Sequence, residues 1–535
     1  MDMKEFIESG NAVLGIELGS TRIKAVLIGA DNAPIAQGES EWENRLMNGI
    51  WTYSMDAVGS GLKSCFKSLQ ADVREKYGTE IGSLKSIGIS AMMHGYLAFD
   101  KNMRLLVPFR TWRNTITGQA ADELTERFSY NIPQRWSVAH LYQAILNNEE
   151  HVKDIAFITT LAGYVHYLLT GNKVLGVGDA SGMFPVDPAT KDFDRRMLDS
   201  FDELVKDRNF PWKIRDILPK VLVAGEDAGT LTEDGAAFLD PSGALKPGAL
   251  VCPPEGDAGT GMAATNSVRE RTGNVSAGTS VFSMVVLEKP MKGVHREIDV
   301  VTTPAGAEVA MVHCNNCTSD LNAWVNIFEE YSKVMGVPVN KSDIYTKIYT
   351  HAMEGDADCG GVLAYNFLSG EPVAGVDEGR PMVVRTPDAT FNLANFMKAN
   401  LYSSLAALKL GNDILSREED VKVDRIMGHG GLFKTKGAGQ NVLAAALKAP
   451  VTCMTTAGEG GAWGIALLAA YSAEVKRGET ANLSDWLDKA VFKDAKGETV
   501  QPDPNDSEGF DRFMVSYRAC LAAEKAAVEN LKISS

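Results

Sequence analysis

The pattern of hydrophobic and polar positions repeats itself at two distant places in the chain. Residues 12–16 form an apolar run that predicts a strand, a polar turn follows at 17–21, and residues 23–28 predict a second strand. The same order of strand, glycine-and-hydroxyl tip and strand returns roughly 260 residues later, over residues 273–287. This spacing is far longer than a solenoid repeat, and it predicts a duplicated lobe.

Between and after the two hairpins, the apolar spacing changes several times between the extended and the helical type. Strands are predicted at 85–91, 249–252 and 425–427, and helices at 55–76, 117–128, 140–148, 158–169, 321–335, 395–410, 440–447 and 510–531. A further helix start is expected over 457–467, where glycines permit close packing. Predicted strands and helices thus alternate along the chain.

The length of the chain predicts more than one domain. A chain of 535 residues is too long for a single hydrophobic core, so two large domains are expected. We place the first at 1–265, the second at 266–475, and a peripheral helical extension of the second at 476–535. Hydrophobic residues make up 45% of the chain and charged residues 23%, which is ordinary for a globular protein.

The charge balance and the cysteines narrow the range of partners and compartments. Lys and Arg number 53 and Asp and Glu 69, and this net charge of −16 argues against nucleic acid and anionic membranes as partners. No secretory signal pattern or transmembrane run is seen, and seven cysteines suit a reducing compartment, so we expect a cytoplasmic protein. Cys314 and Cys317 form one Cys-x-x-Cys pair, which we interpret as buried or loop thiols because a structural zinc site usually needs four ligands.

A single carboxylate, Asp257, stands among small residues at 253–262, directly after the strand predicted at 249–252. Glycines on both sides would let a ligand approach the backbone closely. Taken alone, Asp257 is better explained as the cap of a helix that starts near Ala258, because Asp is a preferred cap residue. The alternative is a catalytic base near a phosphate, since the hairpin tips carry hydroxyl groups and glycine.

Other short segments favour sugar and nucleotide chemistry. His94 and a glycine follow the strand predicted at 85–91, and Trp112 and Asn114 combine an aromatic face with a hydrogen-bonding amide. Each also has an ordinary explanation, as a turn histidine or a core tryptophan. Three glycines at 428–431 lie between a strand and a helix, where bare backbone can approach a base or ribose, although their spacing matches neither a Walker loop nor a dinucleotide fingerprint.

Taken in order, these motifs resemble the FGGY family of carbohydrate kinases, with xylulokinases and ribulokinases nearest in pattern. The resemblance extends from about Ala12 to Tyr471 and rests on segments 17–24, 93–95, 112–114, 178–182, 255–259, 278–280, 368–371 and 428–431. It implies an α/β fold with two domains of the duplicated ribonuclease-H-like, actin-like type and a cleft between the lobes, and it implies use of ATP and Mg²⁺. It further implies a small-molecule sugar as substrate, and homodimers are common in this family.

The resemblance also implies a role for each matching residue. Asp257 is expected to be the general base that accepts the proton of the attacking sugar hydroxyl. The phosphate-binding residues are expected to be Gly19, Ser20, Thr21, Lys24, Gly278, Thr279 and Ser280. The nucleotide-binding residues are expected to be Gly430, Gly431, Phe433 and Gln440, and the sugar-binding residues Met93, His94, Trp112, Asn114 and Asp257. Glu17 and Asp257 are expected to reach the Mg²⁺ of Mg-ATP.

The sequence departs from the family pattern at two of these positions. Glu17 replaces the usual Asp, and Asn114 replaces an Asp, with Thr115 and Ile116 where Gly-Arg usually follows. We expect phosphorylation of a ketopentose, D-xylulose or L-ribulose, to the 5-phosphate, while another polyol or a sugar acid stays open. Two other classes also stay open, a non-kinase ATPase of the actin-like type and a sugar-binding regulator without catalysis.

Overall fold

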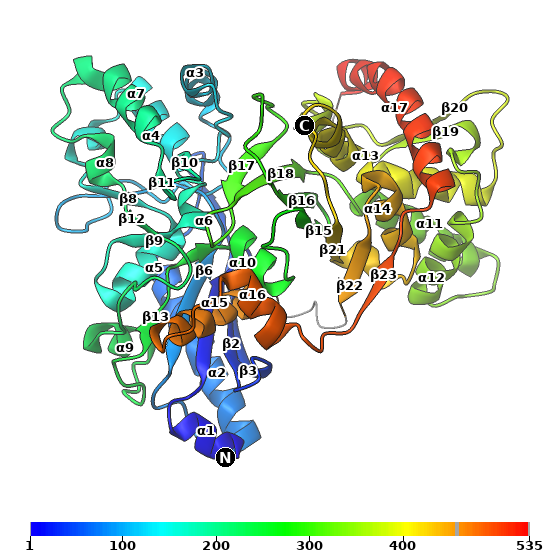
Figure 1. Ribbon diagram of the computed structural model, residues 1–535. Helices are drawn as coiled ribbons and strands as arrows, with labels where there is room; N and C mark the ends of the chain where they lie inside the picture. Colours follow the sequence, from blue (N-terminus) through cyan, green and yellow to red (C-terminus); the bar gives the residue numbers. More distant parts are fainter. Residues whose placement is uncertain (1, 455–459, 533–535) are drawn as a thin grey trace. The chain divides into compact units, whose positions relative to one another are not determined.

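The computed structural model describes residues 2–454 and 460–532 (Figure 1). The chain divides into two compact units. Unit 1 consists of Met1–Val268, Val300–Val309 and Gly458–Ala495, and unit 2 of Arg269–Asp299, Ala310–Ala457 and Lys496–Ser535. Among the described residues, no helix is long and apolar enough to cross a membrane.

Five strands of unit 1 form one path through its main sheet, in the order β13-β6-β1-β2-β3, and β14 also pairs with β6. β1 pairs antiparallel with β2 and parallel with β6, so the first predicted hairpin lies at the centre of the sheet. The strands in or near this unit are β1 (Val13–Leu18), β2 (Arg22–Ile28), β3 (Pro34–Glu41), β4 (Arg45–Met47), β5 (Ile50–Thr52), β6 (Ser86–Ala91), β7 (Leu97–Phe99), β8 (Phe157–Thr159), β9 (Val174–Gly176), β10 (Val186–Asp187), β11 (Asp192–Phe193), β12 (Lys220–Leu222), β13 (Leu250–Val251) and β14 (Glu255–Gly256).

The helices of unit 1 are α1 (Met3–Glu8), α2 (Met55–Tyr77), α3 (Gly118–Phe128), α4 (Ser137–Leu146), η1 (Glu150–Asp154), α5 (Leu161–Thr170), α6 (Val177–Ala180), α7 (Arg195–Val205), η2 (Lys206–Arg208), α8 (Ile214–Ile217), α9 (Glu233–Leu239), α10 (Asp257–Ala264), α15 (Gly460–Lys476), α16 (Leu483–Trp486) and η6 (Leu487–Val491). The helix predicted at 158–169 is shorter than expected, because its first residues form β8. A short apolar run of this kind does not distinguish strand from helix by its spacing.

Two helices cover opposite faces of the main sheet of unit 1. If Gly15 were replaced by a larger residue, its Cβ atom would lie 2.1 Å from the carbonyl oxygen of Ala462. A Cβ atom at Gly88 would lie 2.5 Å from the carbonyl oxygen of Ile465. Both glycines therefore let α15 pack directly on this face of the sheet. A Cβ atom on Gly38, which points to the other face, would lie 2.4 Å from the backbone nitrogen of Leu69 in α2. The main sheet is therefore sandwiched between α15 and α2.

This packing corrects the predicted domain boundaries. We placed residues 266–475 in the second domain, but α15 completes the core of unit 1. The reason is long-range packing, which the local pattern of the helix does not reveal. The part of the predicted helix start at 457–459 lies outside the described residues.

Unit 2 is organised on a second sheet with the order β17-β18-β16-β15-β21-β22-β23. β15 pairs antiparallel with β16 and parallel with β21, as β1 does with β2 and β6, so the second predicted hairpin occupies the equivalent place. The strands are β15 (Thr272–Ala277), β16 (Val281–Val286), β17 (Asp299–Thr302), β18 (Glu308–Cys314), β19 (Val362–Tyr365), β20 (Met382–Arg385), β21 (Arg425–His429), β22 (Val451–Met454) and β23 (Gly497–Val500). The duplication predicted from the two hairpins is therefore confirmed at the level of strand order.

The last helix of the chain belongs to the core of unit 2. Phe510, Phe513 and Tyr517 are buried in its hydrophobic cluster, and the ring of Phe510 stacks on Tyr402 at a centroid distance of 3.9 Å. The peripheral extension predicted at 476–535 is thus wrong for this helix, whose buried face is aromatic. The helices are α11 (Ser319–Val334), α12 (Lys341–Ala352), η3 (Cys359–Gly361), η4 (Pro372–Ala374), α13 (Leu393–Arg417), η5 (Gly431–Lys434), α14 (Ala438–Leu447) and α17 (Pro504–Asn530).

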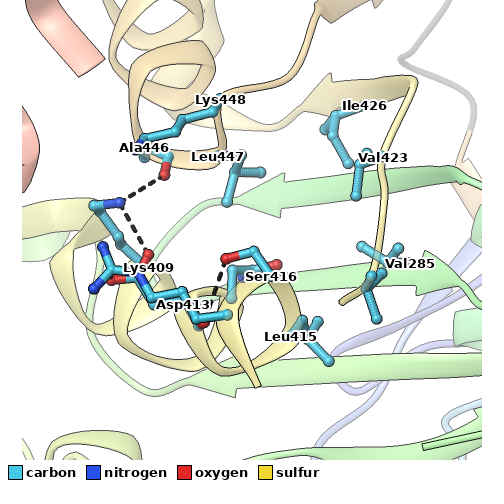
Figure 2. A pocket seen from close by; sticks show the side chains of 13 residues that line it. Val285, Lys409, Asp413, Leu415, Ser416, Val423, Ile426, Ala446, Leu447 and Lys448 are labelled. Carbon is cyan, nitrogen blue, oxygen red and sulfur yellow. Dashed lines mark hydrogen bonds and ion pairs between the residues drawn. The ribbon is translucent and has the colours of Figure 1, made fainter. Parts of the chain in front are cut away.

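A pocket of about 330 Å³ in unit 2 surrounds a buried lysine where α13 and α14 end (Figure 2). The Nζ atom of Lys409 lies 3.0 Å from Asp413 Oδ1 and 2.9 Å from Asp511 Oδ1, and it donates to the carbonyl oxygen of Ala446 at 3.1 Å. These three partners use all three donors of the ammonium group. A cation is also favoured where helices end, so we interpret this cluster as a structural link between α13, α14 and α17.

Candidate active site

The tip of the first hairpin is held from behind by two aromatic side chains. Trp42 Nε1 donates to the carbonyl oxygen of Gly19 at 2.7 Å, and the hydroxyl of Tyr53 donates to that of Ser20 at 2.5 Å. The two rings stack on each other with centroids 4.1 Å apart. In a trans peptide the N–H points away from the C=O, so the amide N–H groups of Ser20 and Thr21 face away from these rings. The tip therefore presents two amide donors and two exposed hydroxyls.

The tip of the second hairpin has the same arrangement with a different support. The backbone N–H and the Oγ1 of Thr318 donate to the carbonyl oxygen of Gly278 at 3.1 and 2.7 Å, and Cys317 N donates to that of Thr279 at 2.9 Å. The amide N–H groups of Thr279 and Ser280 consequently point the other way. In both tips the glycine N–H is used inside the turn, by Arg22 O in the first and Ser280 O in the second. The outward donors are therefore the two residues after each glycine.

Two residues of opposite charge type face each other close to the first tip, at the second pair of strand residues from it. Glu17 on β1 lies directly opposite Lys24 on β2. Burial is the main reason why the pKa of Glu17 rises to about 7, the charge of Asp257 raises it further, and Lys24 opposes both. Glu17 and Asp257 are therefore close enough to repel each other, and a cation between them would relieve that repulsion.

Asp257 begins α10, and its carboxylate is fixed by two backbone donors. Its Oδ1 accepts hydrogen bonds from Met93 N at 3.1 Å and from Ala258 N at 3.0 Å. The cap residue of this helix is Gly256, so the expectation that Asp257 itself caps a helix starting near Ala258 is wrong by one residue. The side chain is exposed to solvent, yet loss of hydration still raises its pKa, while the two amides lower it. A carboxylate so placed is oriented, accessible and more basic than an ordinary aspartate.

Two fully buried acids lie behind Asp257. Glu255 accepts hydrogen bonds from the backbone N–H groups of Gly178 at 3.2 Å and Asp179 at 2.9 Å, and burial raises its pKa to about 8. Asp179 accepts from the hydroxyl of Thr160 at 2.6 Å, and burial also raises its pKa to about 8. Burial therefore favours the protonated form of both acids. The sequence showed Asp179 and Glu255 inside matching motifs, but only the structure shows that both are buried.

Met93 and His94 follow the end of β6 and lie close to these acids. A Cβ atom on Gly256 would lie 2.9 Å from Met93 Cγ and 3.1 Å from Asp179 Oδ1, and one on Gly182 would lie 2.6 Å from His94 Nδ1. His94 has a φ of 72°, a strained value for a non-glycine residue. This conformation directs its ring against Trp136, with centroids 6.3 Å apart. The structure thus brings Met93, His94 and Asp257 together as the sequence predicts.

The predicted sugar residues of the next loop lie differently. Asn114 is buried, its Oδ1 accepts from Trp51 N at 2.8 Å, and its Nδ2 donates to Trp51 O and Thr111 O, both at 2.9 Å. Both amide donors are therefore used to hold the loop against β5. Trp112 keeps 37% of its surface exposed and is free to offer a ring face.

In the glycine loop after β21, the backbone closely approaches Ala277 at the end of β15. Gly430 has a φ of 108°, and a Cβ atom there would lie 2.4 Å from the carbonyl oxygen of Ala277, which no other residue could accept without a shift. Gly431 and Phe433 belong to η5, which begins directly afterwards. Gln440 donates from Nε2 to Val451 O at 2.8 Å and to Glu498 O at 2.7 Å. Its amide donors therefore tie β22 to β23 and are already occupied.

The Cys-x-x-Cys pair lies next to the second tip. Cys314 ends β18, and Cys317 precedes α11. Both thiols are buried, and burial raises the pKa of each, which disfavours the thiolate form that binds metals and reacts. The backbone of Cys317, through its bond to Thr279, is the part of this pair that contacts the tip.

Two protein-family models match most of this chain. The N-terminal domain model of the FGGY family of carbohydrate kinases matches residues 12–241, and the C-terminal domain model of the same family matches residues 273–473. The xylulose kinase of Haemophilus influenzae is 23% identical over 385 residues, which cover 69% of this chain and 72% of that protein.

Solved structures show the same architecture. The xylulose kinase from Rhodospirillum rubrum aligns with a TM-score of 0.75 at 16% identity, covering 96% of this chain and 99% of that one. The gluconate kinase from Lactobacillus acidophilus aligns with a TM-score of 0.75 at 15% identity, covering 98% and 100%. At these identities the likeness concerns the fold, and it confirms the predicted two-domain, actin-like α/β architecture.

Proposed function

Because this chain belongs to the FGGY family of carbohydrate kinases, we propose that it transfers the γ-phosphoryl group of ATP to a primary hydroxyl of an open-chain ketopentose. D-xylulose and L-ribulose are the substrates we favour, with the 5-phosphate as product. The observation that carries the proposal is the position of Asp257, held by two amides beside Met93 and His94 at an accessible point of unit 1.

Asp257 would act as the general base. The oxygen of the sugar hydroxyl forms a bond to Pγ, the bond between Pγ and the bridging β-oxygen breaks, and ADP leaves with that electron pair. The proton of the hydroxyl passes to the carboxylate of Asp257, whose raised pKa suits a base that works near neutral pH. Because phosphoryl transfer has a loose transition state, correct positioning and charge stabilisation supply most of the rate enhancement.

The outward amides and hydroxyls of the two tips would bind phosphate oxygens. Ser20 and Thr21 supply them in the first tip and Thr279 and Ser280 in the second, and Lys24 adds a positive charge near the first. Successive backbone N–H groups that point the same way form a concave anion site. The glycines make these turns possible and do not themselves donate.

Mg²⁺ fits the donor set at the first tip. Carboxylate oxygens are the ligands that Mg²⁺ prefers, and the charge of Asp257 contributes to the raised pKa of Glu17. These two residues would hold the ion of Mg-ATP, directly or through water. When bound, the ion would neutralise charge on the β- and γ-phosphate oxygens.

The acidic side chains near Met93 bear on the choice of substrate. The carboxylate of Asp257 lies in this site, and a sugar acid would bring a further negative charge close to it, so a neutral ketopentose suits the site better. We therefore rank D-xylulose and L-ribulose above gluconate.

A coupled ADP-release assay tests the proposal. D-xylulose, L-ribulose, D-ribulose, L-xylulose, glycerol and gluconate are compared, and the product is identified by mass spectrometry. We expect the highest kcat/KM with one of the ketopentoses. Activity on none of them would overturn the proposal, and ATP hydrolysis that ignores every sugar would favour an actin-like ATPase instead. Sugar binding without any phosphorylated product would favour a regulator.

A further inference from the structure

A four-residue segment of unit 2 connects the second phosphate tip to a loop that the proposed mechanism does not use. This connecting segment, residues 315–318, lies between β18 and α11. On one side Cys317 and Thr318 hold the carbonyl oxygens of Thr279 and Gly278. On the other side, the segment is bound to the loop at 366–371, which contains the Leu-Ser-Gly-Glu motif.

Asn316 is the centre of the second set of contacts. Its Oδ1 accepts hydrogen bonds from the backbone N–H groups of Leu368 at 3.0 Å and Ser369 at 3.1 Å. Its Nδ2 donates to Ser369 O at 3.2 Å and to Glu371 Oε2 at 3.1 Å. The side chain is 5% exposed, so water cannot readily replace these partners.

Glu371 holds the backbone of the same residue. It is fully buried, and its Oε2 accepts from both the backbone N–H and the Nδ2 of Asn316 at 3.1 Å. Burial raises the pKa of Glu371 to about 7, and the hydrogen bonds from Asn316 oppose that rise. Glu371 and Asn316 therefore fix one peptide of the connecting segment from two directions.

The position of this peptide determines what the tip presents. The next two amides of the chain, those of Cys317 and Thr318, are the donors to Thr279 O and Gly278 O. If these carbonyls lose their partners, their peptide planes can rotate, and the outward N–H groups of Thr279 and Ser280 rotate with them. The loop at 366–371 thus controls the tip through a rigid link of two residues.

We propose that Asn316 and Glu371 are positioning residues that keep the second tip in its phosphate-binding conformation. This inference rests on the proposed function, since it assumes that the tip binds phosphate. Among the described residues, neither side chain forms a hydrogen bond with the tip, and both act through the backbone of Cys317 and Thr318.

The test compares ligands with and without phosphates. Binding of ADP and of adenosine to the full chain is measured by isothermal titration calorimetry for the wild type and for Asn316→Ala. We expect the Kd for ADP to rise about tenfold, corresponding to one or two lost hydrogen bonds, and the Kd for adenosine to stay within about twofold. A general loss of folding would move both constants together.

Asn395→Ala is the matched control in the same unit. Asn395 is also buried and also links loops, donating from Nδ2 to Asp356 Oδ2 and to Thr390 O, both at 2.8 Å. Asn395→Ala should lower the stability of the fold by a similar amount, but it should change the Kd for ADP and the Kd for adenosine by the same factor. A second pair of variants, Glu371→Gln and Glu371→Leu, tests the same inference if Asn316→Ala does not fold. Glutamine keeps an acceptor oxygen and should change the Kd for ADP less than threefold, whereas leucine should behave like Asn316→Ala.

The outcomes separate the inference from the proposed function. A wild-type chain that binds ADP no more tightly than adenosine would overturn the phosphate role of the tips, and the proposed function with it. A wild-type preference for ADP that survives in both Asn316→Ala and Glu371→Leu would overturn this inference alone.

Discussion

The two hairpin tips share a backbone and differ in charge. Both lie between antiparallel strands at the centre of a mixed sheet, and both use the glycine N–H inside the turn. Two residues before the glycine, however, the first hairpin has Glu17 opposite Lys24, whereas the second has Ser276 opposite Phe282. The two copies therefore share the display of amide donors, and only the first has ionisable groups at these two positions.

The supports of the tips differ as well. Side chains hold the first tip, through Trp42 and Tyr53, whereas backbone amides hold most of the second, through Cys317 and Thr318. A side-chain donor is lost when its own residue is substituted, whereas a backbone N–H donor remains after any substitution of its residue other than proline. The same geometry should therefore respond unequally to mutation in the two copies.

The largest effect is expected from Asp257→Asn, which removes the base from the copy that carries the charges. We expect kcat to fall about 10²- to 10⁴-fold, because that is the usual contribution of general base catalysis. KM for sugar and for ATP should change little, since asparagine keeps the oxygen that accepts from Met93 and Ala258. Steady-state kinetics with the best ketopentose measures both.

Asp234→Asn, an exposed acid in the first turn of α9, is the control for loss of one negative charge. It should leave kcat unchanged. If Asp257→Asn keeps more than about a tenth of the wild-type kcat, Asp257 is not the base, and the contrast between the copies loses its chemical meaning.

Trp42→Phe tests the side-chain support of the first tip. Phenylalanine keeps a ring to stack on Tyr53 but loses the donor to Gly19 O. One such hydrogen bond contributes about 1 kcal/mol, so we expect KM for ATP to rise about fivefold. An unchanged KM would mean that the strand pair alone fixes this tip.

Thr318→Val gives the corresponding change in the second tip. Valine removes the Oγ1 donor to Gly278 O but leaves the backbone N–H bond to the same oxygen. We therefore expect KM for ATP to rise no more than about twofold, less than for Trp42→Phe. If Thr318→Val is the more harmful substitution, the distinction between the two kinds of support is refuted.

Asp179→Asn is expected to change the pH dependence of stability. The pKa of Asp179 is about 8 in the folded chain and near 3.8 when unfolded, so the unfolded state loses its proton first. The free energy of unfolding should consequently fall as the pH rises from about 4 to about 8. Asparagine cannot titrate, so the decrease of Tm over this range should be smaller in the variant. Thermal unfolding at several pH values measures it, and parallel curves would show that Asp179 is ionised in the folded protein.

Local signals account for the parts of the fold that the sequence predicted well. The hairpins combine apolar runs with glycine at the tip, and β6, α13 and α14 have clear periodicity over predicted segments. The assignment of α15 to the second domain failed because its packing partners, Gly15 and Gly88, lie more than 370 residues earlier in the chain. No local pattern encodes such a contact.

In the candidate site, too, residues within local motifs were predicted, whereas residues that act through long-range contacts were not. The identity of Asp257 and of the tip residues followed from motif order, and their backbone geometry is compatible with the predicted roles. Asn114 and Gln440 matched by position, but the structure shows their amide donors bound to Trp51, Val451 and Glu498. Trp42, Tyr53 and Asn316 were missed because supporting residues carry no chemical signature in the sequence.

The return of α15 to unit 1 has a consequence for the synthesis of the protein. After Val268, about 190 further residues must be translated before α15 begins at Gly460, a delay of roughly 10 to 40 s at ordinary elongation rates. During this time the face of β1 and β6 that carries Gly15 and Gly88 has no covering helix from its own chain. The first lobe can therefore complete its core only after most of the second lobe has been synthesised.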